Sequence, residues 1–323
     1  DLGLFGLSKI VGTVIQDTDG QFIGLTVAED IAFALENDNV PQEDMFLKVD
    51  EVAELVDVKK LLGNAPRELS GGQKQRVSMA GVMVDDVDIL LFDEPLANLD
   101  PATGKRAIDL IDQIQKKKKT TILIIEHRLE DALYRDVDRI IVVGEGRIVA
   151  DTTPDELLAE DVLEKQGIRE PLYVTAIKHA GCRILAEDKP MHMETMRMER
   201  YRDKVRDWFD KAEGKAQRPD APSALKVEDL YFSYVEGKPI LQHIHFDIKK
   251  GEMVSIVGKN GAGKSTLSNL ICGFYKPTRG TILLGGEDMA PLSIKERGEK
   301  IGLVMQSPNQ MISKPMIFDE VAL

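Results

Sequence analysis

Short runs of apolar, often β-branched residues alternate with helix-like stretches through the first 170 residues. In the helix-like stretches, such as AEDIAFALEN, apolar positions recur at the spacing of one helix face. This alternation is typical of a parallel sheet covered by helices. The pattern therefore predicts an α/β fold with a mostly parallel sheet. Strands are predicted at residues 11–15, 89–92, 121–125 and 139–143.

Local signals predict where several of these elements begin and end. Thr26 and Glu29 have the spacing of a capping box, so a helix is expected to begin after Thr26. GEGRIVA follows the fourth strand and predicts a hairpin that turns on its glycines. The four lysines at 116–119 follow the apolar face of DLIDQI and are interpreted as the solvated end of a helix.

The pattern of apolar and charged residues changes at about residues 171 and 225. These changes divide the chain into residues 1–170, 171–224 and 225–323. The middle block carries many charges of both signs and ends in Pro, Ala and Ser, which indicates a helix and then a linker. From residue 225 onward, strands alternate with glycine-containing turns. The last of these strands, MVSIV, leads into the glycine loop GKNGAGKST and a predicted helix.

The two ends of the chain resemble each other. VGTVIQ at 11–16 matches IGLVMQ at 301–306 in residue type, and VAEDIA at 27–32 matches IFDEVA at 317–322. Both matches have the same offset of 290 residues, without a gap. The ends are therefore interpreted as the same segment of two similar domains.

Composition limits the classes of function. The 323 residues are 43% hydrophobic and 30% charged, as in a soluble globular protein. A net charge of −13 argues against nucleic acid as a partner, because phosphate contacts need a basic face. Cys182 and Cys272 are far apart, which fits a reducing cytosol and no metal site. The start, DLGLFGLSKI, lacks the features of a signal peptide and is expected to lie within a domain.

The glycine loop carries the chemistry of phosphate binding. The spacing Gly258-x-x-x-x-Gly263-Lys264-Ser265, between a predicted strand and a predicted helix, is that of a Walker A loop. Its glycines allow backbone N–H groups to face phosphates, and the helix N-terminus adds a favourable dipole. Lys264 is expected to contact the β- and γ-phosphates of ATP, and the Ser265 hydroxyl to bind Mg²⁺. The other residues expected at the nucleotide are Asn260, Gly261 and Thr266.

Two carboxylates follow the apolar run ILLF. Asp93 is expected to hold Mg²⁺ through water molecules, and Glu94 to polarise the attacking water as a general base. A strand that ends in two surface acids is the alternative. The position of the pair after LSGGQ and directly before the segment PLANLD favours catalysis.

In their order and spacing, LSGGQKQR, ILLFDEP, ANLD and IIEHR resemble the motifs of ATP-binding cassette (ABC) proteins. The resemblance implies a P-loop NTPase cassette with a helical signature subdomain and an antiparallel β subdomain. It also implies that the signature clamps the γ-phosphate of ATP bound to the opposite domain. Asp100 would lie in the loop that links the two sites, and His127 would be the switch histidine at the γ-phosphate. The signature residues are Ser70, Gly71, Gly72 and Gln73.

Three further residues take their roles from the resemblance. Gln16 and Gln306 end matched short strands and stand at the position of the Q-loop glutamine. In the family this residue approaches Mg²⁺ and the attacking water, and its loop senses a transmembrane partner. Tyr234, ahead of the glycine loop, matches the aromatic residue that stacks on adenine; the alternative is a tyrosine in a strand core.

The motifs stand in an unusual order, because Ser70 of the signature precedes Lys264 of the Walker A loop by 194 residues. The repeat accounts for this order if residues 1–170 are the back of one cassette and residues 225–323 the front of the next. The missing halves would then belong to a longer chain. Alternatively, the two parts pack together as a permuted cassette, which we expect for the chain alone because exposed apolar sheet faces are costly.

QDTDGQFIGLTVAEDIAFALEN and EHRLEDAL resemble the ATPases of energy-coupling factor (ECF) importers, which bring vitamins and metal ions into prokaryotic cells. Duplicated forms are associated with uptake of a thiamine precursor. The resemblance implies ATP and Mg²⁺ as cofactors, and a transmembrane coupling subunit and a substrate-binding membrane subunit as partners. It places the protein at the cytoplasmic face of the cell membrane. The alternatives are a soluble tandem-cassette ATPase acting on ribosomes, and a domain that binds ATP without hydrolysis.

Overall fold

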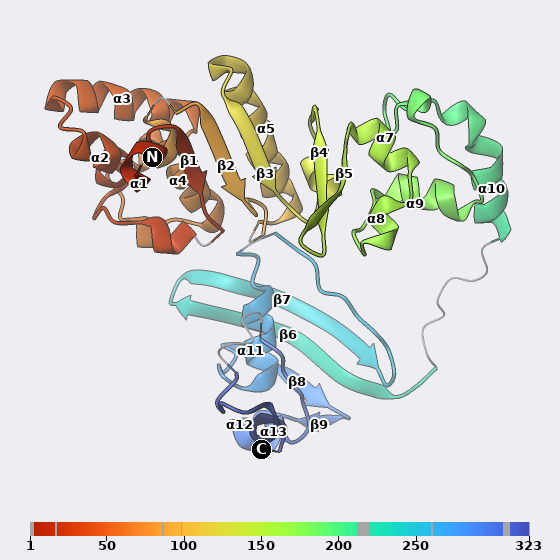
Figure 1. Cartoon of the computed structure of the whole chain (residues 1–323). Helices are drawn as coiled ribbons and strands as arrows, with labels where there is room; N and C mark the ends of the chain where they lie inside the picture. Colours follow the sequence, from red (N-terminus) through yellow and green to blue (C-terminus); the bar gives the residue numbers. More distant parts are fainter. Residues whose placement is uncertain are drawn as a thin grey trace. The chain divides into compact units, whose positions relative to one another are not determined.

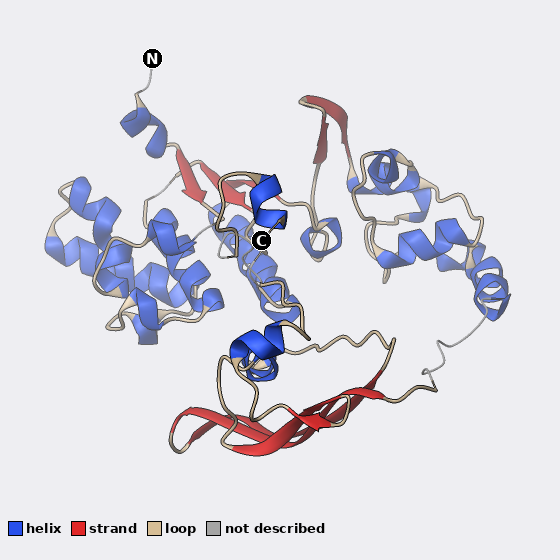
Figure 2. Cartoon of the chain, turned by 90° about the horizontal axis from the view of Figure 1, so that it is seen from below, coloured by secondary structure: helices blue, strands red, loops and turns tan. Residues whose placement is uncertain are grey.

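The computed structural model describes residues 3–16, 18–85, 87–97, 99–211, 220–259, 261–305 and 311–322. The chain divides into two compact units, Asp1–Ala212 and Glu213–Leu323 (Figure 1). Helices dominate the first unit, and a long antiparallel sheet dominates the second (Figure 2).

The first unit begins with a parallel sheet in the order β1-β2-β3, and all three strands were predicted from the sequence. The predicted capping box is also confirmed, since Glu29 N–H donates to Thr26 Oγ1 and Thr26 N–H to Glu29 Oε2. The helix with the lysine run ends at Lys118, where Lys119 takes a left-handed backbone conformation. The elements are α1 (Leu4–Ser8), β1 (Val11–Val14), α2 (Val27–Asn37), α3 (Gln42–Leu55), α4 (Gly71–Met83), β2 (Ile89–Asp93), α5 (Pro101–Lys118), β3 (Thr121–Ile125) and α6 (Leu129–Ala132).

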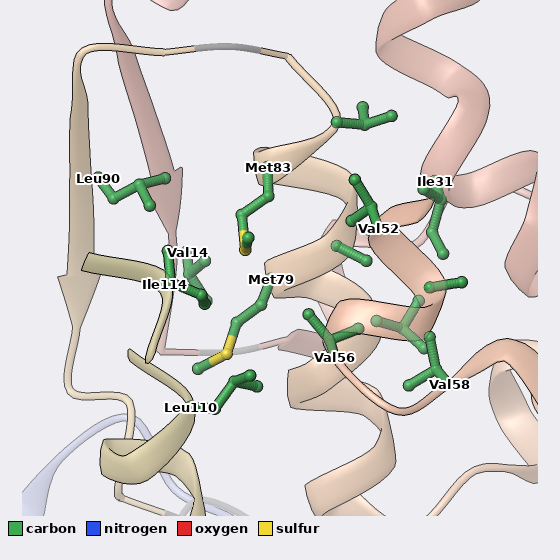
Figure 3. Packing of buried hydrophobic residues seen from close by; sticks show 14 of the residues in the cluster. Val14, Ile31, Val52, Val56, Val58, Met79, Met83, Leu90, Leu110 and Ile114 are labelled. Atoms are coloured by element: carbon green, nitrogen blue, oxygen red, sulfur yellow. The ribbon is translucent and has the colours of Figure 1, made fainter. Parts of the chain in front are cut away.

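Helix α4 stands at the centre of the first hydrophobic core. Met79 and Met83 of α4 lie between Val14 and Leu90 of the sheet and the apolar face of α3 (Figure 3). Gly12 of β1 must be glycine here, because a Cβ atom at this position would overlap the Val82 side chain of α4. The sheet and the helix that follows the LSGGQ motif are therefore packed together tightly.

A second core lies in the remainder of the first unit. The predicted hairpin is confirmed, since β4 and β5 pair antiparallel across Glu145 and Gly146. Leu157 and Leu158 of α7 are buried with Val174 of α9 and Tyr201, whose hydroxyl donates to the buried Asp188. The elements are β4 (Ile140–Gly144), β5 (Arg147–Thr152), α7 (Pro154–Ala159), α8 (Val162–Lys165), α9 (Leu172–His179) and α10 (Arg202–Lys211).

The second unit is a four-stranded antiparallel sheet in the order β7-β6-β8-β9. Leu267 and Leu270 of α11 pack on its apolar residues, among them Leu230 of β6. The elements are β6 (Ser223–Val235), β7 (Lys238–Lys249), α11 (Lys264–Cys272), β8 (Arg279–Leu284), β9 (Glu287–Asp288), α12 (Ile294–Gly298) and α13 (Ile317–Val321).

Two strand predictions in the second unit are wrong. Residues 253–257, the run MVSIV, and residues 301–305 form no strand in the described structure. Met253 and Val257 are exposed, and so is Val304. A strand of a parallel sheet needs a hydrogen-bonded neighbour on at least one side, and these segments have none among the residues that the structure describes.

Candidate nucleotide site

Three polar side chains follow the carboxyl ends of the three parallel strands. Gln16 follows β1, Glu94 follows β2, and His127 follows β3. The Gln16 amide donates from Nε2 to Glu94 Oε2 at 2.6 Å, and His127 Nδ1 lies 3.6 Å from Glu94 Oε1. The structure thus brings together three predicted catalytic residues that are up to 111 positions apart in the sequence. Asp93, the predicted Mg²⁺ residue, is the last residue of β2 and pairs with Ile125.

The backbone of Glu94 has a conformation that is rare outside glycine. Its φ angle is +46°, while its N–H continues the ladder by donating to Ile125 O at 2.9 Å. A non-glycine residue in this region costs on the order of 1 kcal/mol or more, and such residues cluster at functional sites. The turn directs the Glu94 carboxylate to the sheet edge at which Gln16 and His127 lie.

Two side chains for which the sequence predicted no role hold this turn in place. The buried Gln75 of α4 donates from Nε2 to Pro95 O, and Arg128 donates from Nη1 to Leu96 O at 2.8 Å. Gln75 lies within LSGGQKQR and Arg128 within IIEHR, but their contacts with residues 95 and 96 depend on the fold.

Glu126 was also missed. Its side chain is 2% exposed, and Oε1 accepts hydrogen bonds from the backbone N–H groups of His127 at 3.2 Å and Arg128 at 3.1 Å. The carboxylate therefore fixes the turn that presents His127. A charged residue directly after a five-residue apolar strand and before a histidine was the available signal.

The predicted signature residues form the N-terminus of α4. Ser70 is the N-cap, and its N–H donates to Gln73 Oε1 at 2.8 Å. Gly71 and Gly72 begin the helix. A Cβ atom on Gly72 would lie 2.7 Å from Thr103 Cγ2, so glycine allows the first turns of α4 and α5 to approach.

Asp100 is the N-cap of that second helix, α5. Its Oδ1 accepts from the N–H groups of Ala102 at 3.1 Å and Thr103 at 3.2 Å, and its Oδ2 accepts from the Thr103 hydroxyl at 2.8 Å. Thr103 therefore contacts Asp100 directly and lies against Gly72. Thr103 thus connects Gly72 of the signature with Asp100 within the first unit.

Two glycines of the predicted phosphate-binding loop in the second unit have left-handed backbone conformations. Gly261 and Gly263 have φ angles of +79° and +91°, and a Cβ atom on Gly263 would lie 2.7 Å from Leu241 Cδ2. Lys264 begins α11 and donates from Nζ to Gly258 O at 2.7 Å and Lys259 O at 2.9 Å. This ammonium group therefore lies over the loop, where phosphate oxygens can replace the carbonyls as its acceptors.

Tyr234 lies beside the first turn of α11 and not in the strand core. Its ring is half-exposed and packs edge-on against Phe232 and Tyr275, with centroid distances of 4.9 and 5.3 Å. The hydroxyl is 3.1 Å from Thr266 Oγ1. An exposed aromatic face next to the glycine loop fits the predicted role in stacking on a base.

Two predicted site residues, Asn260 and Gln306, lie outside the described residues. Ser265 is exposed on the first turn of α11. In the part of the chain that the structure describes, no three His, Cys, Asp or Glu side chains gather as ligands for a metal ion. Mg²⁺ at nucleotide sites is held by one or two protein oxygens together with phosphates and water, so the Asp93 carboxylate in the first unit and the Ser265 hydroxyl in the second are each suited to it singly.

In a comparison with known protein families, the chain matches two family models. Residues 6–97 and 241–319 match the ABC transporter model, so the match is split between the two units. Residues 160–232 match a model described as ATP-binding cassette cobalt transporter. That second match includes α8, α9 and α10 and continues into β6.

Bacterial ABC transporter ATP-binding proteins align with the whole chain or nearly so. The protein from Clostridium perfringens is 55% identical over 323 residues, which are 100% of this chain and 57% of that protein. The protein from Photobacterium profundum is 54% identical over 321 residues, or 99% of this chain and 57% of its own length. The chain therefore spans little more than half the length of these relatives. A solved structure, cbiO1 from Clostridium perfringens, described as part of the ABC transporter complex cbiONQ, is 31% identical; it has a TM-score of 0.48 and covers 55% of this chain and 72% of that one.

Proposed function

The chain belongs to the ABC transporter family of ATP-binding proteins and has its cassette fold, and from this premise we propose that it binds and hydrolyses ATP to drive solute uptake. The observation that carries the proposal is the convergence of Gln16 and His127 on Glu94. Such a carboxylate, fixed at the edge of a parallel sheet, is suited to activate a water molecule that attacks the γ-phosphate.

The second unit supplies groups that bind the nucleotide of its own cassette. Lys264 and the loop N–H groups would hold the phosphates, and Tyr234 would pack on the adenine. When bound, Mg²⁺ neutralises charge on the phosphate oxygens; Ser265 would hold it at the nucleotide site of the second cassette, and Asp93 at that of the first.

We further propose that each unit is one part of a cassette whose other part lies elsewhere in a longer protein. Support comes from the repeat with an offset of 290 residues and from the 57% coverage of the relatives. Packing supports the same view. In the first unit Val27 and Ile31 of α2 are 0% exposed, whereas their counterparts Ile317 and Val321 in α13 are 85% and 83% exposed.

The proposed partners are a transmembrane coupling subunit and a substrate-binding membrane subunit, as in ECF-type importers. The described residues contain no helix with the length and apolarity that a bilayer crossing requires. We propose a peripheral place at the cytoplasmic face of the membrane, as the resemblance to ECF-type importers implies. The family model matched by residues 160–232 favours a metal ion such as cobalt over a vitamin or thiamine precursor as the solute.

Mg-ATP hydrolysis by the intact encoded protein, compared with its Lys264→Ala and Glu94→Gln variants, tests the proposal. We expect Lys264→Ala to abolish ATP binding at its site. Glu94→Gln should retain binding and lower turnover by about 100-fold or more, because it removes only the general base. Unchanged turnover in Glu94→Gln would exclude the assigned role of Glu94.

Fractionation separates the transporter from a ribosome-acting ATPase. The proposed importer subunit should sediment with membranes and be released when the membrane subunits are deleted. Sedimentation with ribosomes, independent of membranes, would contradict the proposal.

A further inference from the structure

One carboxylate of α2 binds the segment that precedes this helix. Asp30 Oδ1 accepts hydrogen bonds from two consecutive backbone N–H groups, those of Ile23 at 2.8 Å and Gly24 at 3.1 Å. The next two N–H groups, of Leu25 and Thr26, donate to Glu29 Oε2 at 2.9 and 3.0 Å. Four successive backbone donors are thus held by the first turn of one helix. We call the contact of Asp30 with residues 23 and 24 the carboxylate clamp.

The second unit contains the same clamp. Glu320 of α13 accepts, through Oε2, from the N–H groups of Ser313 at 2.8 Å and Lys314 at 2.7 Å. These three residues stand 290 positions after Asp30, Ile23 and Gly24. The two backbone hydrogen bonds hold the pKa of the Glu320 carboxyl below its ordinary value.

The two clamps differ in a way that indicates compensation. A Cβ atom on Gly24 would lie 2.8 Å from Asp30 Cα and 2.9 Å from Thr26 O, so the short aspartate side chain draws the loop close enough to require glycine. The second clamp pairs a lysine with a glutamate, whose side chain is one methylene longer. Because of this extra methylene, a glutamate can reach the same two N–H groups from a loop that lies farther from the helix, as a loop residue with a Cβ atom requires.

The clamp connects the segment that follows Gln16 with helix α2, which packs on the signature helix α4. The clamped residues end the segment that begins at Gln16, and Gln21 within it donates from Nε2 to Thr13 O at 3.2 Å. Helix α2 packs on α4, where a Cβ atom on Gly81 would lie 3.8 Å from Asp30 O. The clamp thus ties the segment that carries Gln16 to a helix seated on α4, at whose N-terminus Ser70 lies.

We propose that Asp30 is a positioning residue that fixes the loop after Gln16, so that the Gln16 amide remains on Glu94. In the second unit Glu320 holds residues 313 and 314 in the corresponding way. This inference rests on the proposed ATPase function. It predicts that the size of the side chain in the loop and the length of the carboxylate side chain are matched at positions 24 and 30, and at 314 and 320. A Gly/Asp pair and a Lys/Glu pair should therefore work, and mixed pairs should not.

The test exchanges one pair for the other in the intact encoded protein. We expect Gly24→Lys to lower kcat about tenfold with little change in KM for ATP, a coupling of the size found between contacting residues. The double variant Gly24→Lys/Asp30→Glu should recover to within about threefold of the parent. The matched control is Asp44→Ala, an acid in the first turn of α3, which should have no effect.

A second readout separates positioning from general stability. In a Gln16→Ala background, Asp30→Ala should cause no further loss of kcat, because the group it positions is gone. Amide hydrogen exchange at residues 23 and 24 should rise about tenfold or more in Asp30→Ala. It should return toward the parent rate in the double exchange variant.

The outcomes distinguish this inference from the proposed function. A parent protein without hydrolysis would contradict the proposed function, and the exchange rates at residues 23 and 24 would still test the clamp. If hydrolysis occurs but the double variant is no better than Gly24→Lys, the compensation is excluded. Additive losses of kcat from Gln16→Ala and Asp30→Ala would exclude a positioning role.

Discussion

At the scale of single residues, Gly263 is constrained twice. Its φ angle of +91° lies in a region that side chains disfavour, and a Cβ atom would also press on Leu241 Cδ2. The φ angle would strain only the backbone of a substituted residue. The overlap of an added Cβ atom with Leu241 would also displace the loop from the β-hairpin that contains Leu241.

Gly263→Ala should therefore weaken ATP binding by about tenfold or more, because the loop N–H groups lose their common direction. Isothermal titration calorimetry measures the change. The matched control is Gly237→Ala in the turn between β6 and β7, where φ is +78° and no described atom lies within 4 Å of the added Cβ. This control should cost similar backbone strain and leave ATP affinity unchanged; an equal loss of affinity would contradict the argument.

The sequence predicted the residues whose chemistry is local and missed those whose role depends on the fold. Lys264 and Glu94 could be found because a short spacing around each specifies the reaction. Gln75 supports a backbone turn that a distant segment forms, so its partner could not be known before the fold. Glu126 supports the turn directly after it, but that turn itself is set by the fold. The clamp of Asp30 is intermediate, because its counterpart at Glu320 was already present in the repeat.

At the scale of elements, the apolar runs of the first unit became strands as predicted, and two similar runs of the second unit did not. Residues 11–14 pair with β2 over four positions, whereas the matching residues 301–304 have no strand partner in the described structure. The side chains agree with this difference, since Val14 is 1% exposed and Val304 is 83% exposed. An apolar, β-branched sequence favours a strand. The strand forms only where a neighbouring strand can pair with its backbone N–H and C=O groups.

A capping box at α7 gives a pH-dependent prediction. The Thr152 and Thr153 hydroxyls and the Thr153 N–H donate to the Glu156 carboxylate and hold its pKa below the ordinary value. A lowered folded-state pKa stabilises the fold at neutral pH, and this contribution is lost as pH falls through the ordinary pKa toward the lowered one. Helix α7 carries Leu157 and Leu158 into the second core, so the loss should appear in the unfolding of that core.

Thr153→Val should therefore lower stability most at neutral pH, and the difference from the parent should shrink in acid. Urea unfolding at several pH values measures this. The control is Thr175→Val in α9, whose hydroxyl donates only to Pro171 O among the hydrogen bonds described for it, so its effect should not vary with pH. A pH-independent effect of Thr153→Val would contradict the assignment to Glu156.

At the scale of the whole molecule, the repeat allows one position to be tested in two surroundings. Gly12 lies under α4, where an added Cβ would overlap Val82 and lie 3.2 Å from Val87 Cγ2. Its counterpart 290 residues later, Gly302, has no described atom within 4 Å of the same Cβ. If the proposed tandem arrangement holds, a longer protein supplies a helix like α4 over Gly302.

Gly12→Ala should then destabilise the 323-residue chain by about 1–3 kcal/mol through overpacking, while Gly302→Ala should change its stability by less than about 0.5 kcal/mol. In a protein extended beyond residue 323 by the second signature helix, Gly302→Ala should become about as costly as Gly12→Ala, because the covering side chains are then present. Urea unfolding of both lengths measures the four differences. A Gly302→Ala variant that stays neutral in the longer protein would mean that no such helix covers this segment, and the tandem arrangement would be wrong. The loss of unfolding free energy caused by Gly302→Ala in the longer protein thus tests whether the second cassette is completed from the same chain.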